Sequence, residues 1–145
     1  MVGRLPDRVF VIQVQKVFMP VNVLVVDDSK LARINAGKAL TQLQPDWRRV
    51  EAASAAQALD IVAAEPIDIA LIDFNMEEKD GLTLAGELRD MHPTMPIAII
   101  TANIQDEIIA RARALNASFV AKPLTAEGLQ GFISGASLRL KSVGK

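Results

Sequence analysis

The sequence predicts an α/β fold built on a five-stranded parallel sheet, and three observations support this prediction. Short apolar runs alternate with segments of helical periodicity from residue 22 onward, which is the pattern of successive βαβ units. The runs are rich in Val, Ile and Leu, as expected of parallel strands that are buried on both faces. Four of the runs end at polar or charged residues, which places chemistry at one edge of the sheet.

The five strands are expected at 22–26, 48–52, 68–72, 96–100 and 117–121. The segment at 48–52 has the weakest strand pattern, and the run at 96–100 is the most apolar. Strict alternation of strands and helices implies right-handed crossovers, so that helices cover both faces of the sheet.

The helices between the strands have start signals and apolar faces. Ser29, Ser54 and Thr125 stand where an N-cap side chain accepts a backbone N–H group, and Asp106 with Glu107 suits the N-terminal end of a helix dipole. The first helix is predicted to bury Leu31, Ile34, Ala39, Leu40 and Leu43, and the helix after Gly81 is predicted to bury Leu82, Leu84, Leu88 and Met91.

Length and composition indicate one globular domain. The chain has 145 residues, of which half are hydrophobic and 23% are charged, and this balance is not that of a disordered protein. The formal net charge of -1 gives no global electrostatic case for nucleic acid or an anionic membrane. The chain has no cysteine, which excludes disulfides, zinc-thiolate sites and cysteine nucleophiles. We therefore expect a cytoplasmic protein that binds neither nucleic acid nor membrane.

The predicted domain spans 21–141, with an N-terminal extension at 1–20 and a short tail at 142–145. The β-prone run at 9–18 is interrupted by glutamines and no small-residue cleavage site follows it, which argues against a secretory signal. Two interpretations of the extension stay open. It is either a leader left by an upstream start codon, or an added strand that covers a sheet edge or reaches a partner.

The candidate site lies where the strands end. Asp27 and Asp28 follow the first strand, and Asp73 follows the third. Because the carboxyl ends of parallel strands meet at one edge, the three carboxylates are expected to crowd together there. One pair at about 5 Å costs on the order of 3 kcal/mol at an effective dielectric near 20, and a divalent cation relieves that repulsion. Oxygen ligands of this kind suit Mg²⁺.

These residues and their spacing resemble the receiver domain of two-component response regulators. The resemblance covers about 21–140 and implies a flavodoxin-like (βα)5 fold with the strand order 2-1-3-4-5. It is carried by the acidic pair followed by Ser29, the apolar run into Asp73, Asp80-Gly81, Thr101-Ala102 and Lys122-Pro123.

The resemblance implies that Asp73 accepts a phosphoryl group from a histidine kinase or a histidine phosphotransfer protein. It further implies that Mg²⁺ or Mn²⁺ binds to Asp28, to Asp73 and to the backbone carbonyl of Asn75, while Asp27 acts through water. The protein would then be a phosphoacceptor with slow self-dephosphorylation rather than an enzyme, and Asn75 and Asn103 would tune the dephosphorylation rate.

The resemblance also implies a switch. Lys122, Thr101 and Ala102 are the implied phosphoryl-binding and switch residues, and Phe119 is the aromatic residue that would turn inward. The signal would leave through the surface at 105–140, toward a downstream protein target or a phosphorylation-dependent homodimer. Ordinary core packing remains an alternative for Phe119, because phenylalanine lacks the hydroxyl of the commoner tyrosine.

Other interpretations stay open at this point. The acidic pair at Asp27 and Asp28 can cap a helix, Lys122 can be a surface lysine, and Thr101 can be an ordinary β-branched strand residue. Glu77 stands where the family often has proline, so the loop after Asp73 can be aimed differently.

Three alternative functions also remain. The chain can be a receiver-like protein-binding module that phosphorylation does not regulate, or a receiver fragment of a larger regulator. The third alternative is a phosphohydrolase with an aspartyl-phosphate intermediate. Asn75 disfavours it, because that class usually has a second aspartate at this position.

Overall fold

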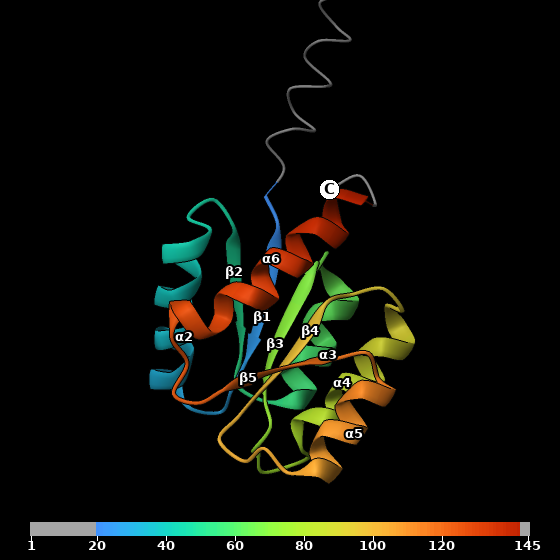
Figure 1. The fold of residues 1–145 in the computed structure, drawn as a ribbon. Helices are drawn as coiled ribbons and strands as arrows, with labels where there is room; N and C mark the ends of the chain where they lie inside the picture. Colours follow the sequence, from blue (N-terminus) through green and yellow to red (C-terminus); the bar gives the residue numbers. More distant parts are fainter. Residues whose placement is uncertain (1–19, 143–145) are drawn as a thin grey trace, which may run out of the picture.

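The computed structural model describes residues 20–142, and these form a five-stranded parallel sheet covered by helices on both faces (Figure 1). The strand order is β2-β1-β3-β4-β5, as predicted. The strands are β1 (Asn22–Val26), β2 (Arg48–Ala52), β3 (Ile69–Asp73), β4 (Ile97–Thr101) and β5 (Ser118–Ala121). The helices are α2 (Lys30–Leu43), α3 (Ala55–Ala64), α4 (Gly81–Met91), α5 (Asp106–Ala114) and α6 (Ala126–Ser142). The run at 9–18, for which an added strand was one interpretation, lies outside the described residues.

Two hydrophobic cores hold the layers together, one on each face of the sheet. Ala36, Ala39 and Leu40 of α2 pack with Leu129 and Ile133 of α6 on one face. The other face is covered by α3, α4 and α5, whose buried members include Ala58, Leu84, Leu88, Ile108 and Ala112. Each strand of the central pair, β1 and β3, is buried along its whole length, which explains why both read as continuous apolar runs.

Three strands begin one residue later than the sequence indicates. Asp68 directly precedes β3, where its backbone N–H donates to the carbonyl of Asn22 at 2.9 Å and its carboxylate Oδ2 accepts the N–H of Asn22 at 2.8 Å. Pro96 has no N–H to give to a ladder, and β4 starts at the next residue. The consequence is that Asp73 and Thr101 are the last residues of β3 and β4, paired with Ile100 and Ala121 respectively.

The predicted capping residues act as expected. The Ser29 and Ser54 side chains accept N–H groups from Ala32 and Gln57, and the Thr125 hydroxyl accepts the N–H of Gly128. These caps set where α2, α3 and α6 begin.

The prediction that Leu31, Ile34 and Met91 are buried was wrong. Leu31 is 68% exposed, Ile34 38% and Met91 43%. Leu31 lies in the first turn of α2 and Met91 is the last residue of α4. With about 3.6 residues per turn, Leu31 and Ile34 lie on the side of α2 opposite its buried residues Ala36, Ala39 and Leu40.

The edge of the sheet where the strands begin, here called the amino edge, holds the one tryptophan of the chain. Trp47 directly precedes β2 and is partly buried against the core between α2 and α6.

Across residues 20–142 no helix combines the length and the hydropathy that crossing a bilayer requires.

Candidate functional site

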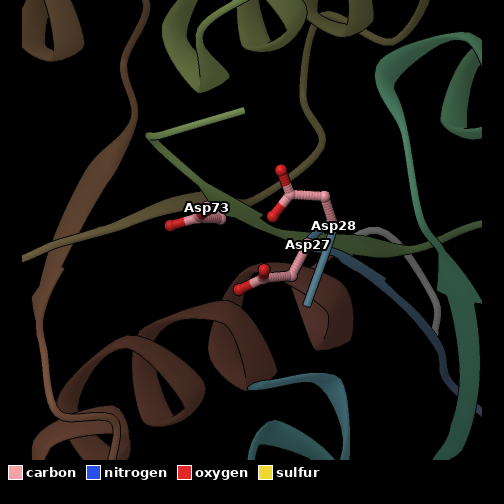
Figure 2. A group of neighbouring side chains, drawn as sticks. All are labelled: Asp27, Asp28 and Asp73. Atoms are coloured by element: carbon pink, nitrogen blue, oxygen red, sulfur yellow. The ribbon is translucent and has the colours of Figure 1, made fainter. Parts of the chain in front are cut away.

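The carboxyl edge of the sheet, where the strands end, gathers three aspartates. Asp27 and Asp28 follow β1, Asp73 ends β3, and these two strands are paired side by side. One carboxylate oxygen from each residue lies within 4.8 Å of the others. Figure 2 shows the three side chains extending from the two strand ends toward the same region. Asp27 and Asp73 are buried, whereas Asp28 is exposed and closes the cluster on its solvent side.

Lys122 supplies the cation of this edge. It follows β5, and its Nζ lies 2.6 Å from Oδ1 of Asp73. The carboxyl group of Asp73 is 4% exposed, while the lysine side chain is 34% exposed. Among residues 20–142, this ion pair leaves the other two carboxylates of the cluster without a partner cation. Lys122 is therefore not an ordinary surface lysine in this structure.

Hydrogen bonds fix both the backbone and the side chain of Asp27. Its backbone N–H donates to the carbonyl of Ala52 on β2 at 3.1 Å, and its Oδ1 accepts the N–H of Ser29 at 2.9 Å. Burial raises the pKa of the Asp27 carboxyl, and the negative charge of Asp73 adds to this, while the hydrogen bond from Ser29 opposes it. The N-cap of α2 is Ser29, so the capping interpretation of the acidic pair was wrong.

Arg33 of α2 was missed by the sequence interpretation. Its Nη1 donates to the backbone carbonyl of Asp27 at 2.7 Å, and its Nε donates to Glu51 of β2 at 2.9 Å. An arginine on the polar side of a helix carries no sequence signal for such a contact, because the contact depends on how β2 lies beside β1.

Gly81, the first residue of α4, lies directly against the backbone of Asp73. A Cβ at this position would lie 2.4 Å from the backbone oxygen of Asp73, a distance that real Cβ atoms do not adopt. The backbone N–H of Gly81 donates to the carbonyl of Phe74 at 2.8 Å. Only glycine allows α4 to start this close to the end of β3.

The remaining predicted residues lie around this cluster. Thr101 is fully buried, and its Oγ1 accepts the N–H of Asn103 at 3.0 Å. Ala102 lines a hollow of about 450 Å³ together with Asp27 and Lys122. Phe119 of β5 is partly buried against the core of the α3–α4–α5 face. The structure thus brings Ala102 to the acidic cluster, whereas Phe119 packs on the core.

Two loop residues predicted to tune dephosphorylation, Asn75 and Asn103, are exposed. Glu77 lines a second, smaller hollow of about 70 Å³ beside Asp28. Within the described part of the chain, neither side chain contacts the acidic cluster, so the roles of Asn75 and Asn103 remain predictions.

The acidic cluster could hold a divalent cation. Its donors are carboxylate oxygens only, which hard cations such as Mg²⁺ prefer. Oδ1 of Asp73 is buried, and apart from the ion pair with Lys122 it makes no directed hydrogen bond within residues 20–142, so it keeps acceptor capacity. Both the donor set and the unsatisfied charge fit such an ion. The backbone carbonyl of Asn75 remains a predicted ligand.

Residues 23–134 match the family described as the response regulator receiver domain. The chain belongs to this family. The receiver domain is also similar to individual proteins of known name. It is 32% identical over 125 residues to the probable chemotaxis protein CheY of Rhizobium etli, and the match covers 83% of this chain and 95% of that protein.

Longer relatives share only part of their length with this receiver domain. It is 35% identical over 133 residues to the protein-glutamate methylesterase/protein-glutamine glutaminase 2 of Pseudomonas aeruginosa. That match covers 88% of this chain but 38% of the relative. The chain therefore spans well under half of that protein.

Solved structures agree on the fold. The chemotaxis protein CheY4 of Vibrio cholerae, crystallised at low pH, has a TM-score of 0.74 at 23% identity, covering 81% of this chain and 99% of that chain. A response regulator receiver domain protein from Clostridium thermocellum has a TM-score of 0.75 at 25% identity, covering 85% and 98%. The receiver domain thus has the CheY-like, flavodoxin-like arrangement of strands and helices.

Proposed function

We propose that this receiver domain accepts a phosphoryl group on Asp73 from a histidine kinase or a histidine phosphotransfer protein, with Mg²⁺ bound at the acidic cluster. The observation that carries the proposal is the setting of Asp73. Its Oδ1 is buried, lies 2.6 Å from a single ammonium group, and sits within a cluster of three carboxylates that has excess negative charge.

The proposed reaction is a displacement at phosphorus. A carboxylate oxygen of Asp73 forms a bond to phosphorus while the bond from phosphorus to the imidazole nitrogen of phosphohistidine breaks, and the imidazole leaves with the bonding electron pair. Bound Mg²⁺ would supply positive charge that balances the three phosphoryl oxygens. Asp28, Asp73 and the Asn75 carbonyl would hold it directly, and Asp27 would act through water. Lys122 would bind a phosphoryl oxygen, since its Nζ already lies beside Oδ1.

Access for the donor is consistent with this proposal. The hollow of about 450 Å³ next to the acidic cluster is lined by Ala32 of α2 and by Pro123 and Leu124 after β5. Leu31, in the first turn of α2, is 68% exposed. An imidazole approaching Asp73 would meet these apolar side chains together with the charged groups of Asp27 and Lys122, which also line the hollow.

The proposed output is the surface formed by α5, β5 and α6. Thr101 Oγ1 is bonded to the backbone of Asn103, and a phosphoryl group would compete for that hydroxyl and shift the loop that leads into α5. Arg111 of α5 contacts both carboxylate oxygens of Asp80 at 3.3 Å, which connects the loop after Asp73 to the same surface. A downstream protein, or a second phosphorylated copy, is the proposed partner there.

This proposal makes the domain a phosphoacceptor with slow self-dephosphorylation rather than a hydrolase. Histidine kinases use ATP, so we place the exchange in the cytoplasm. No activity of the longer relatives is carried over to this chain.

The test is phosphorylation in solution, followed by intact mass and by gel retardation. The protein is incubated with acetyl phosphate and Mg²⁺, beside Asp73→Asn and a matched carboxylate removal on the exposed face of α3, Asp60→Asn. Wild type and Asp60→Asn should gain one phosphoryl group, and Asp73→Asn should gain none. Chelation of the metal should abolish the gain.

A second test replaces acetyl phosphate with phosphorylated histidine kinases as phosphoryl donors. If folded wild-type protein gains no phosphoryl group from acetyl phosphate or from a panel of phosphorylated histidine kinases, the phosphoacceptor role is excluded. The protein-binding module would then take its place.

A further inference from the structure

The guanidinium of Arg33 connects three elements directly behind the acidic cluster. Arg33 belongs to α2, donates through Nη1 to the carbonyl of Asp27 at 2.7 Å, and donates through Nε to Glu51 of β2 at 2.9 Å. Its side chain is only 14% exposed. A nearly buried cation is therefore bonded to the backbone of the acidic loop, and not to any of the carboxylates that form the cluster.

The carbonyl that Arg33 holds belongs to the peptide between the two acidic residues. A planar peptide fixes the relative orientation of its two flanking Cα atoms, so the bond to this oxygen sets how the side chains of Asp27 and Asp28 leave the backbone. A hydrogen bond from a charged donor is shorter and stronger than a neutral one. The bond therefore resists the mutual repulsion that would otherwise turn the two carboxylates away from Asp73.

Glu51 orients the guanidinium rather than contributing much energy of its own. Its side chain is 36% exposed, and ion pairs at that exposure are worth little because solvent screens them. Oε1 contacts Arg33, while Oε2 contacts Arg49 at 3.4 Å. Arg49 lies over α2 at Gly37, where an added Cβ would meet its guanidinium at 2.0 Å. Two arginines thus share one carboxylate, but only Arg33 reaches the acidic loop.

We propose that Arg33, oriented by Glu51, is a positioning residue for the cation site. It holds the carbonyl of Asp27 so that the Asp27 and Asp28 carboxylates already face Asp73 when a metal ion arrives. This inference rests on the proposed function, because it requires that the cluster binds Mg²⁺. Arginine suits the task because its planar fork serves two acceptors at once, which a lysine ammonium on a flexible stem does less well.

Electrostatics and positioning predict opposite results for the loss of Arg33. Removal of a positive charge near three carboxylates should strengthen the binding of a cation if charge alone matters. Loss of a residue that positions the ligands should weaken the binding, and residues behind a metal site typically change affinity by about 10-fold to 100-fold. The sign of the change therefore separates the two explanations.

The experiment is titration of the metal-free, full-length protein with Mg²⁺ by isothermal calorimetry. Arg33→Met should raise the Kd by about tenfold, the lower end of that range. Arg33→Lys and Glu51→Gln should raise it by less. Arg49→Met is the matched control, because it removes the other cation on Glu51 without touching the loop, and it should leave the Kd within about twofold of wild type.

A charge-reversed pair separates positioning from a purely structural role. In the double variant Arg33→Glu, Glu51→Arg the ion pair between α2 and β2 is restored, but no donor on α2 reaches the carbonyl of Asp27. The thermal midpoint should recover toward wild type, whereas the weakened Mg²⁺ affinity should persist. Circular dichroism and urea unfolding confirm that each variant is folded before titration.

The outcomes distinguish this inference from the proposed function. If wild type binds no Mg²⁺, the metal site itself is excluded. If wild type binds Mg²⁺ and folded Arg33→Met binds it equally or more tightly, the positioning role is overturned while the proposed function stands. Recovery of affinity in the charge-reversed pair would also overturn it, because an ion pair alone would then suffice.

Discussion

The two edges of the sheet differ in how their charged groups are paired. At the amino edge, the guanidinium of Arg89 at the end of α4 donates to backbone carbonyls over distances of 2.6 to 3.4 Å. These carbonyls belong to His92, Pro93, Met95, Leu115 and Asn116. At the carboxyl edge, three carboxylates face one lysine. At the amino edge a cation is hydrogen-bonded to neutral carbonyls, whereas at the carboxyl edge three carboxylates lie close together.

This difference separates stability from chemistry along the same strands. Arg89 joins the loops after α4 and α5, so the amino edge is fastened by bonds that need no ligand. Burial lowers the pKa of Arg89, and the nearby positive charge of Arg139 adds to this. The carboxyl edge keeps excess negative charge, which the proposed Mg²⁺ ion would balance. Strong effects on stability are therefore expected at one edge, and strong effects of ligands at the other.

The largest effect on stability should come from breaking the amino edge. Arg89→Met removes the donor to several partly buried carbonyls, and we expect the free energy of unfolding to fall by about 3 kcal/mol. Urea unfolding measures this loss. Arg139→Met, which removes a neighbouring arginine that lies on the exposed face of α6, is the control and should change stability by less than about 0.5 kcal/mol. Mg²⁺ affinity should be unchanged in both variants, and a change in Arg89→Met would show that the two edges are coupled.

A glycine pair tests the close contact beneath the acidic cluster. Gly81→Ala forces a Cβ against the backbone of Asp73, and we expect a loss of about 2 kcal/mol together with slower phosphorylation. Gly86→Ala lies within the same helix, and its Cβ would be in ordinary contact with Leu115 at 3.8 Å. That variant should gain up to about 1 kcal/mol from helix propensity. Equal effects at the two positions would contradict the assigned role of Gly81.

Mg²⁺ should stabilise the protein through the carboxyl edge alone. At a free concentration ten times the Kd, binding adds about 1.4 kcal/mol to the free energy of unfolding. Asp28→Asn should lose this increment, because it removes one proposed ligand while leaving the buried Asp27 and Asp73 carboxylates intact. Asp68→Asn removes a carboxylate that binds the N–H of Asn22 at the amino edge. It should keep the increment whatever its own effect on stability, and loss of the increment there would refute the division between the edges.

The smallest effect concerns the link from the site to α5, and it depends on pH. Burial raises the pKa of Asp80, but hydrogen bonds from Thr83 and the charge of Arg111 outweigh it, so the pKa lies below its usual value of 3.8. A lowered folded-state pKa contributes stability above the unfolded pKa, and the contribution disappears as pH falls through the folded-state value.

Asp80→Asn keeps a cap acceptor for α4 but loses the charge that pairs with Arg111. It should cost about 0.5 kcal/mol at neutral pH, because the pair is partly exposed. The difference from wild type should vanish as the pH drops below 3.8. Urea unfolding from pH 7 to pH 3 measures it, and Arg111→Met should show the same loss with little further change in the double variant. A difference that persists unchanged at the lowest pH would refute the linkage.

The gathering of Asp27, Asp28, Asp73 and Lys122 at one edge could be predicted from the sequence, because it follows from residue patterns along single strands. The strand order followed from the resemblance to receiver domains, since the spacing of the strands alone does not determine it. The contacts of Arg33 and Arg89 could not be predicted. Each depends on which backbone carbonyls arrive beside the guanidinium once neighbouring strands and loops are placed, and a charged residue on a helix indicates only a polar face. Leu31 and Ile34 misled the prediction because α2 has apolar residues on both of its sides, and periodicity alone does not reveal which side packs on the sheet.

The position of Trp47 determines what an optical measurement of this protein can detect. Its indole packs against the core beside β2 at the amino edge, so its emission follows the loss of that core when the protein unfolds. The aromatic residue next to Asp73 is Phe74, which fluoresces only weakly. Events at the carboxyl edge should therefore leave the emission nearly constant. A Phe74→Trp substitution would place a fluorophore beside Asp73, the proposed phosphoacceptor, so that the same fluorescence measurement would report on that edge.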